Sequence, residues 1–462
     1  MNEPRAEHNL QVSENRDLEG ASQPGSIGVN GLEWDSGAPW RPPLSVQQFT
    51  QLIERFPSTA DACLSLADDG EDLAQTGWGV VYGPEVGDEV REALRPLLQL
   101  RRNQADSRQR LYAELQLKED EDAGAFLKRL DCDGQWIDPQ LVPGYLLLVG
   151  DCRQIPFPVQ TSFPLAYNVG RLPLSSAEEY AAYAQAAVDN ELSRQLRPRR
   201  VALAGSNGGN SGRLVPPVED LMEAVERAII RARPSWDAMT LTQGLTTQER
   251  LSRLLSGTSE TPSLLLASGR GVCSVSEGAS DLLGALVCCD YVDGKLGLEH
   301  VFDQGKVPEE APLNGLLILL QGSFTAGRPA HPLLDQMLER PPADALDAAL
   351  PRRLLGHRAG AALAVVGHCE NSWLHLAARS RPDEWAESMT DLLQALLGRQ
   401  RVGAALQQYR RHCCRLAKVL EEDSGTDSEE GRQRLIEAWA LRQEARNWIL
   451  MGDPASRLPV AG

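Results

Sequence analysis

The sequence predicts an α/β fold with a mostly parallel sheet flanked by helices. Six short segments carry apolar residues almost without interruption: residues 78–82, 145–150, 201–205, 263–268, 316–321 and 361–367. Continuous apolarity, rather than alternation of apolar and polar residues, is typical of strands that are buried on both faces. Longer segments with helical spacing lie between them, and this alternation of strands and helices predicts an α/β class.

Helix signals support this assignment. Ser176 and Glu179 form the S-x-x-E pattern of a capping box ahead of an alanine-rich stretch. The stretch "PPVEDLMEAVERAIIRA" begins with proline and acidic residues, which suit a helix N-terminus. Residues 384–450 read as mostly helical, interrupted by the acidic "EEDSGTDSEEG", which we expect to be a mobile loop.

The organisation along the chain follows from these patterns. Residues 1–33 are polar and rich in glycine, without periodicity, and predict a disordered tail. We expect an N-terminal α/β subdomain over residues 34–198. A second subdomain with a helical C-terminal part should occupy residues 199–462.

The net charge, the length of the apolar runs and the cysteine spacing argue against several classes of protein. A net charge of −18 argues against a protein that binds nucleic acid or an anionic membrane surface. No apolar run approaches the roughly 18 residues of a membrane span, and the first residues lack the order of a secretory signal, so a cytoplasmic location is the expectation. Nine cysteines without CxxC spacing indicate reduced thiols. Within "HCC", Cys413 falls on a helical apolar face and should point into a core rather than bind metal.

The stretch "GLLILLQGSFTAGRP" raises the question of catalysis. Its apolar run is followed by a turn that contains Ser323 between glycines. Catalytic side chains often lie in such turns at the ends of buried strands. The cysteines at positions 273, 288 and 289 have no evident histidine partner and should be small buried residues. The glycine-rich "SNGGNSG" fits neither phosphate-binding motif, so we expect no cofactor there.

Three motifs in order along the chain resemble one family. They are "YLLLVGDCRQIPF" with Gly150 and Asp151, "YNVGRLPLSSAEEYAAYAQ" with Gly170 and Arg171, and "ARNWILMGDPASRLP" with Gly452, Asp453 and Pro454. Together they resemble the gingipain-type caspase-like cysteine peptidases, particularly their intracellular bacterial relatives. The resemblance spans the chain from about residue 78 to its end. It implies a caspase-like fold in two subdomains.

The same resemblance implies a histidine and a cysteine just after two neighbouring strands. Here the first turn carries Gly269 and Arg270 after Ser268, and the second carries Ser323, followed by Gly327. Arginine stays protonated and cannot act as a base. A serine hydroxyl depends on an adjacent base to become nucleophilic. The resemblance therefore predicts a pseudoprotease without catalytic residues, cofactor or metal.

Several hypotheses about the function of the protein remain open at this point. The protein can be a scaffold or regulatory partner of an active caspase-like protease, of that protease's regulator or of its substrate. The resemblance suggests a bacterial defence or programmed-death system for this role. Alternatives are a weak serine-type hydrolase that uses Ser323, with His331 or His368 as base, and a substrate of an active protease. We expect His368 to be structural or to lie at the rim of the cleft.

Overall fold

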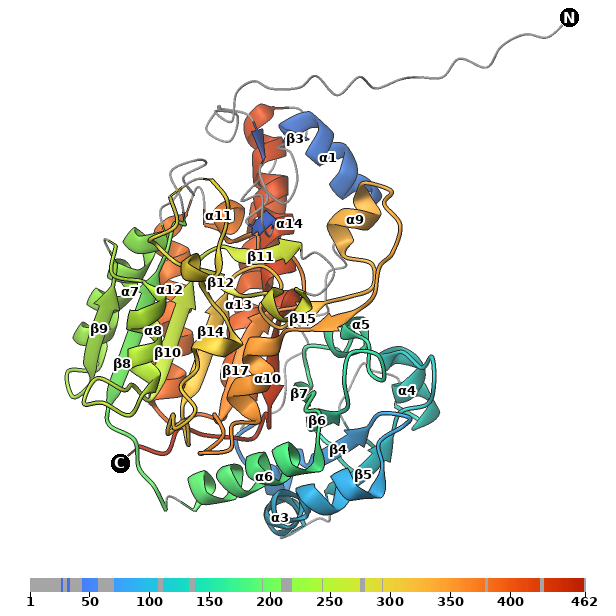
Figure 1. The fold of residues 1–462 in the computed structure, drawn as a ribbon. Helices are drawn as coiled ribbons and strands as arrows, with labels where there is room; N and C mark the ends of the chain where they lie inside the picture. Colours follow the sequence, from blue (N-terminus) through green and yellow to red (C-terminus); the bar gives the residue numbers. More distant parts are fainter. Residues whose placement is uncertain are drawn as a thin grey trace, which may run out of the picture.

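A ten-stranded sheet runs through the centre of the protein (Figure 1). The computed structural model describes residues 26–27, 31–33, 44–56, 70–106, 111–132, 138–192, 194–208, 218–242, 244–274, 279–292, 294–378, 381–423 and 428–460. From one edge to the other the strands are β5 (Tyr112–Gln116), β4 (Trp78–Tyr82), β6 (Tyr145–Val149), β7 (Asn168–Leu172), β18 (Trp448–Gly452), β17 (Ala364–His368), β14 (Leu317–Gln321), β10 (Leu264–Ser268), β8 (Arg200–Gly205) and β9 (Asp237–Leu241).

Most of the ladders in this sheet are parallel, which confirms the predicted α/β class. The pairs β4–β5, β4–β6, β6–β7, β8–β9, β8–β10, β10–β14 and β14–β17 run parallel, whereas β18 is antiparallel to β17. All six predicted strands lie in the sheet. Strands from residues 34–198 and from residues 199–462 stand side by side in it, and the division into two subdomains stays a prediction.

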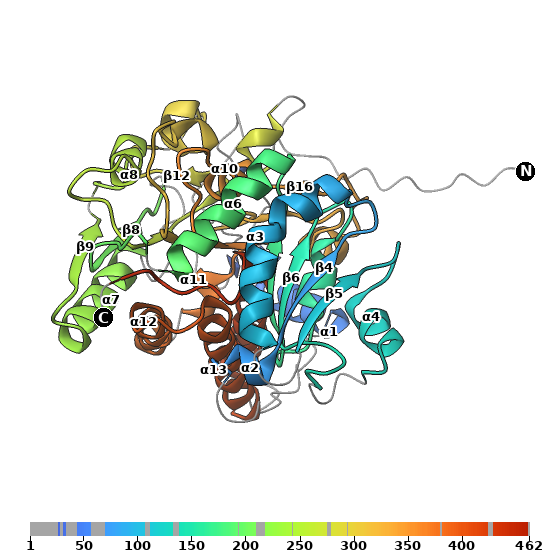
Figure 2. The same ribbon diagram turned by 90° about the horizontal axis from the view of Figure 1, so that it is seen from below.

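Helices cover both faces of the sheet, because successive strand residues point to opposite sides. Leu147 and Ile318 pack with one helical layer, which contains α3 (Asp88–Ala105), α6 (Ala177–Glu191), α8 (Gln248–Leu255) and α10 (Ala349–Leu355). Figure 2 shows α3 and α6 side by side in this layer. Leu317 and Leu319 pack with the opposite layer of α7 (Val218–Ala232), α12 (Pro382–Leu397) and α13 (Val402–Glu422). A separate apolar cluster packs Leu146 and Leu148 against α4 (Ala123–Arg129) and α5 (Phe157–Thr161).

Three smaller sheets lie outside the ten-stranded sheet. A four-stranded sheet contains β13 (Val301–Phe302), β12 (Leu286–Val287), β11 (Gly271–Ser274) and β2 (Gly31–Glu33). Two short strand pairs join β1 (Ser26–Ile27) with β3 (Leu44–Ser45), and β15 (Gly327–Arg328) with β16 (Leu346–Asp347). The remaining α-helices of the described residues are α1 (Val46–Arg55), α2 (Leu73–Thr76), α9 (Leu333–Met337), α11 (Leu374–Ala377) and α14 (Glu429–Asn447).

The structure differs from the sequence-based expectations in three places. Strands β1 and β2 lie within the segment predicted to be a disordered tail. Strand β18 ends the C-terminal segment that was expected to be helical up to residue 450. Both ends of the expected acidic loop are helical, because α13 continues to Glu422 and Ser428 caps α14; residues 424–427 lie outside the described part of this stretch.

Other local expectations are confirmed, one of them in part. The Ser176 side chain accepts the Glu179 N–H at the start of α6, as expected, but the Glu179 carboxylate accepts the Ser175 N–H and not the Ser176 N–H, so only half of the predicted capping box forms. Cys413 is buried on α13, and the cysteines in the described ranges are all free thiols. No helix in the described part of the chain is long and apolar enough to cross a membrane.

Candidate functional site

The ends of β10 and β14 bring together the two turns singled out in the sequence. Ser268 and Gln321 are the last paired residues of these parallel strands, and the Ser268 hydroxyl donates to the Gln321 side-chain oxygen at 3.2 Å. One residue further on, the Gly269 N–H donates to the Gln321 carbonyl oxygen at 3.0 Å. The positions where the resemblance expects a histidine and a cysteine are therefore neighbours at one sheet edge.

Ser323 lies completely inside the protein. Its side chain is 0% exposed, and its Oγ accepts the Ser372 N–H at 3.1 Å. The next residue, Phe324, has a φ of 59° and donates its N–H to the Glu370 carbonyl oxygen at 3.0 Å. A bulky residue in this left-handed region is strained, so the surrounding structure must hold the turn in place.

His368, the last residue of β17, and the loop after it provide much of that support. Thr325 donates its hydroxyl to the Leu320 and Gly322 carbonyl oxygens and accepts the His368 N–H at 2.9 Å. The Ala326 N–H donates to the His368 carbonyl oxygen at 2.8 Å. The Ser323 turn is thus tied by backbone and side-chain hydrogen bonds to the loop that follows the neighbouring strand.

Two glycines let the small sheet close over Ser323. A Cβ atom at Gly271 would lie 2.1 Å from the Ser323 carbonyl oxygen, and one at Gly284 would lie 2.2 Å from the Phe324 carbonyl oxygen. Since real Cβ contacts do not come so close, only glycine fits at these positions in the present arrangement. Neither residue could be singled out from the sequence. The only signal was the high glycine content around them.

Arg270 lies beneath the same cover. It is 7% exposed, and its carbonyl oxygen accepts the Val287 N–H from β12 at 2.9 Å. Its guanidinium remains protonated at any physiological pH, so it cannot take a proton from Ser323.

His368 is a buried structural residue, as expected, and it does not lie at a rim. It is 0% exposed, its Nε2 lies 2.9 Å from Glu444 Oε2, and its ring stacks on Trp448 at 5.9 Å between centroids. The other Glu444 oxygen accepts the Trp373 N–H. In contrast, the Nε2 atom of His331 contacts the Arg340 carbonyl oxygen at 2.8 Å. Each ring therefore already has a specific partner.

The first family motif forms the turn after β6. Gly150 has a φ of 141°, and the Asp151 carboxylate accepts the N–H groups of Arg153 and Gln154. Burial opposes ionisation of Asp151, but these backbone bonds and the Arg153 side chain outweigh it and lower the pKa of Asp151. The Cys152 N–H donates to Asp347 Oδ2 at 2.8 Å, so this turn contacts the β15–β16 pair that follows the Ser323 turn.

The second motif contacts both of the others. Arg171 is completely buried on β7, donates to the Ile155 carbonyl oxygen at 2.6 Å and lies 4.4 Å from the Phe157 ring centroid. At Gly170, a Cβ atom would lie 2.1 Å from the Gly452 carbonyl oxygen. The glycines of the second and third motifs therefore permit close contact between the two segments. Gly327 has a similar role, because a Cβ there would meet the Phe157 ring at 2.4 Å.

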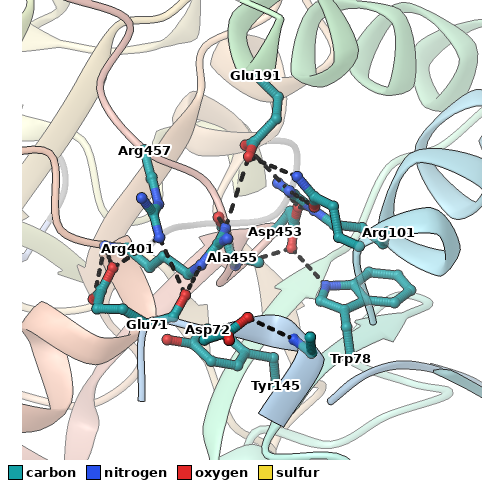
Figure 3. A network of polar contacts seen from close by, with 12 residues as sticks. Glu71, Asp72, Trp78, Arg101, Tyr145, Glu191, Arg401, Asp453, Ala455 and Arg457 are labelled. Atoms are coloured by element: carbon teal, nitrogen blue, oxygen red, sulfur yellow. Dashed lines mark hydrogen bonds and ion pairs between the residues drawn. The ribbon is translucent and has the colours of Figure 1, made fainter. Parts of the chain in front are cut away.

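The third motif anchors a buried ionic network (Figure 3). Asp453 is 0% exposed; Oδ1 accepts the Trp78 Nε1–H at 2.9 Å, and Oδ2 lies 2.7 Å from both Nε and Nη2 of Arg101. The Asp453 N–H donates to the Tyr183 hydroxyl at 2.6 Å. Pro454 follows and packs against Gly170 and Gly403. Asp453 thus links the C-terminal strand to α3 and α6.

The network continues through further charged residues. Glu191 pairs with Arg101 at 3.1 Å and approaches Arg401 at 3.9 Å, while Glu71 pairs with Arg457 at 3.1 Å and accepts the Arg401 N–H. Burial opposes ionisation of Glu191, but Arg101 and Arg401 lower its pKa. Burial, followed by repulsion from Arg101 and Arg457, lowers the pKa of Arg401 to about 10. These contacts are structural, and among the charged residues of the network only Asp453 stands in a motif that the sequence singles out.

Chemically, the site offers a buried hydroxyl and a permanently charged arginine at the two expected positions. Among the described residues, no group of three or more His, Cys, Asp or Glu side chains could hold a metal ion. Cys273 and Cys288 are buried, and burial raises the pKa of the Cys288 thiol. Of the glycine-rich stretch at residues 206–212, the structure describes residues 206–208, and residues 209–212 lie outside the described part.

Comparisons with known proteins found similarity only at the level of solved structures. No family profile and no curated protein sequence matches the chain. The arginine-specific cysteine proteinase gingipain R is 12% identical, with a TM-score of 0.48 over 82% of this chain and 78% of that one. A complex of pro- and mature domains of RgpB from Porphyromonas gingivalis gives 11% and 0.46, covering 82% and 79%. A structure described as a protease gives 13% and 0.49, covering 82% and 78%. The family resemblance seen in the motifs, and the loss of a catalytic pair, therefore stay predictions.

Proposed function

We propose that the protein is a catalytically inactive, caspase-like pseudoprotease that works by binding another protein. The single observation that supports this proposal best is the complete burial of Ser323. A nucleophile must reach the scissile carbonyl at close to contact distance. Ser323 sits beneath the small sheet, and its Oγ accepts the Ser372 N–H.

The chemistry of the neighbouring position also favours inactivity. Arg270 replaces the expected base and cannot accept a proton. His368, a histidine considered as a substitute, is buried against Glu444 instead. The Ser323 hydroxyl is buried, and the neighbouring position holds the cationic Arg270. The fold therefore keeps the positions of an acyl-transfer site without a base that could activate the nucleophile.

Binding is the activity that such a scaffold can retain. By resemblance, the partner is an active caspase-like protease, its regulator or its substrate, in a bacterial defence or programmed-death system. The edge of a sheet can bind a segment of a protein partner without any chemical reaction.

Labelling of the full chain with a fluorophosphonate tests the inactive state directly. The wild type should give no label, and neither should Ser323→Ala; an authentic serine hydrolase in the same tube serves as the positive control. The paired replacement Ser323→Cys with Arg270→His should also fail to cleave a peptide library, because burial remains. A label that depends on Ser323, or cleavage of peptides by the wild type, would contradict the proposal.

Partner capture tests the binding role. Tagged wild type and Ser323→Ala proteins should recover the same protein from the native host with equal yield, and the purified pair should bind with equal affinity. If Ser323→Ala loses the partner while remaining folded, the Ser323 turn is itself part of the interaction. If neither form binds any protein, the binding role is refuted.

A further inference from the structure

A surface groove lies at the carboxyl ends of strands β4, β5 and β6. It has a volume of about 770 Å³. Its walls come from the turn after β4 (residues 84–85), the loop after β5 (residues 117–122), the turn after β6 (residues 153–154) and α5 with its flanking residues. The volume lies within the range of ligand pockets, roughly 300–1,000 Å³. The groove is separate from the Ser323 turn, and the function proposed above does not use it.

The order of the strands makes this edge a place where parallel sheets bind ligands. The chain passes from β4 to β5 on one side of β4 and then to β6 on its other side. The connecting helices lie on opposite faces of the sheet, because α3 packs on the face of Leu147 and α4 packs on the face of Leu146 (Figure 2). The turns after β4 and β6 therefore diverge, and a crevice forms between them. The groove occupies this switch point in the strand order.

Internal ion pairs hold the walls of the groove in place. The Glu121 carboxylate pairs with Arg129 at 2.6 Å and accepts the Lys118 N–H at 3.0 Å. The hydrogen bond from Arg129 lowers the pKa of Glu121, and the charge of Lys118 adds to this effect. On the opposite wall, Arg153 pairs with Asp151 at 2.8 Å. The cationic side chains of the lining thus already interact with carboxylates of the fold.

Several other polar groups of the lining are hydrogen-bond acceptors without donors. Glu85, Glu119 and Asp120 line the groove, and in the described part of the chain no cationic or donor group partners them. The side-chain oxygen of Gln154 is buried and has no donor among the described residues either. It lies at the crevice between β4 and β6, since a Cβ atom at Gly83 would be 2.7 Å from it. A ligand that satisfies these oxygens must supply positive charge and N–H donors.

The unpaired carboxylates do not converge on one point. Glu85 follows β4, whereas Glu119 and Asp120 follow β5, and among the described residues no group of three or more His, Cys, Asp or Glu side chains could hold a metal ion. The positive charges of a matching ligand must therefore be spread along a chain. Leu117 and Val159 add apolar surface to the lining, which suits methylene groups between such charges.

We propose that this groove binds a small organic polycation, namely a diamine or polyamine whose ammonium groups are joined by methylene segments. The ammonium groups pair with Glu85, Glu119 and Asp120, and one N–H donates to the side-chain oxygen of Gln154. The methylene segments contact the apolar part of the lining. The net charge of −18 attracts such a ligand to the protein from solution. The proposal does not depend on the state of Ser323 or on a protein partner.

Calorimetric titration of the full chain with spermidine tests the site. One spermidine should bind per chain at low salt. The triple replacement Glu85→Gln, Glu119→Gln and Asp120→Asn should weaken the binding at least about 10-fold, because it removes the charges that pair with the ligand. Asparagine suits position 120, where φ is 56°.

A matched control changes the net charge by the same amount outside the groove. The triple replacement Glu54→Gln, Glu387→Gln and Asp391→Asn alters three exposed acidic residues on other helices. It should change the affinity for spermidine by less than about 2-fold, because salt screens charges that lie far from the ligand. Equal losses in the two triple variants would mean that spermidine is only attracted to an acidic protein, and the proposal would be wrong.

A replacement without any change of charge separates a specific site from general attraction. Gln154→Met removes the buried oxygen and should weaken spermidine binding about 5-fold, since one hydrogen bond to a charged donor is lost. In the wild type, spermidine should slow hydrogen exchange in residues 83–85, 117–122 and 153–162. This map decides the question even if a variant fails to fold.

Three results would overturn the proposal. They are the absence of saturable binding by the wild type, protection from exchange outside these segments, and an unchanged affinity in Gln154→Met together with the groove triple variant. A capped lysine tripeptide provides the competing ligand. If it binds more tightly than spermidine, the groove takes a protein segment, and the assignment to a small polycation is wrong.

Discussion

Replacement of Asp453 by Asn should destabilise the fold strongly, although the side chain keeps its size. The carboxylate is completely buried and accepts hydrogen bonds from Trp78, Arg101 and the Ala455 N–H. Asparagine removes the negative charge and turns an NH₂ group toward donors that need an acceptor. The buried guanidinium of Arg101 then keeps its contacts with Glu191 and with the Gln104 side-chain oxygen, and Glu191 is the negative partner that remains.

The expected loss can be estimated from this geometry. Removing one partner of a buried ion pair typically costs about 3–5 kcal/mol, because the other charge stays buried without compensation. A guanidinium is not deprotonated in proteins, so Arg101 does not escape this penalty by losing its proton when Asp453 is replaced. Since Glu191 still neutralises part of that charge, we expect a loss near the lower limit, about 3 kcal/mol.

Urea unfolding followed by circular dichroism measures this loss. The matched control is Glu92→Gln on the same helix α3, which breaks an exposed pair with Arg95 and should change the stability by less than about 0.5 kcal/mol. A double replacement, Arg101→Met with Asp453→Leu, should lose less than the two single replacements added together, because no charge is left unpaired. If Asp453→Asn is as stable as the control, the network does not hold the C-terminal strand to α3, and the reasoning is refuted.

Three further predictions concern the site. Gly271→Ala, whose Cβ would meet the Ser323 carbonyl oxygen, should lower the unfolding free energy by about 3 kcal/mol or more, whereas Gly124→Ala within α4 should be neutral or stabilising; equal melting temperatures would contradict this. Burial raises the pKa of Glu370 to about 8. The folded state thus holds a proton that the unfolded state releases above about pH 4.3, so wild-type stability should fall as pH rises between these values, and Glu370→Gln should show a flatter profile; parallel profiles would exclude this effect. Ser323→Ala leaves the Ser372 N–H without its acceptor and should cost about 1–3 kcal/mol in chemical unfolding, whereas a gain in stability would show that this bond does not support the turn.

Much of the central sheet could be predicted because burial on both faces leaves a local signature. The segments 145–149 and 317–321 are apolar at nearly every position, and both are inner strands. The edge strands β5 and β9 carry polar residues such as Glu114 and Asp237, so the same signature was absent there. Strand β7 was hidden for a different reason: Asn168 and Arg171 interrupt its apolarity, and only the tertiary structure buries them.

The candidate site was predictable in its position but not in its surroundings. Two parallel strands place their following turns at one edge, so the neighbourhood of Gly269, Arg270 and Ser323 followed from the assigned strands. The cover over Ser323 did not, because it depends on close approach at Gly271 and Gly284, and a sequence does not show which glycine meets which backbone.

The sequence by itself determined which segments are buried, where several helices begin, and which residue types stand at the expected catalytic positions. These properties are local, since hydrophobic periodicity and capping depend on residues a few positions apart. Only the tertiary structure decided that Ser323 is closed off, that His368 pairs with Glu444, and that Asp453 meets an arginine 352 positions earlier in the chain. Such pairs depend on which segments the fold brings together and on which buried charges then lie next to an opposite charge. These contacts form only when the whole chain is folded, because burying a charge costs too much free energy unless an oppositely charged or hydrogen-bonding partner lies next to it.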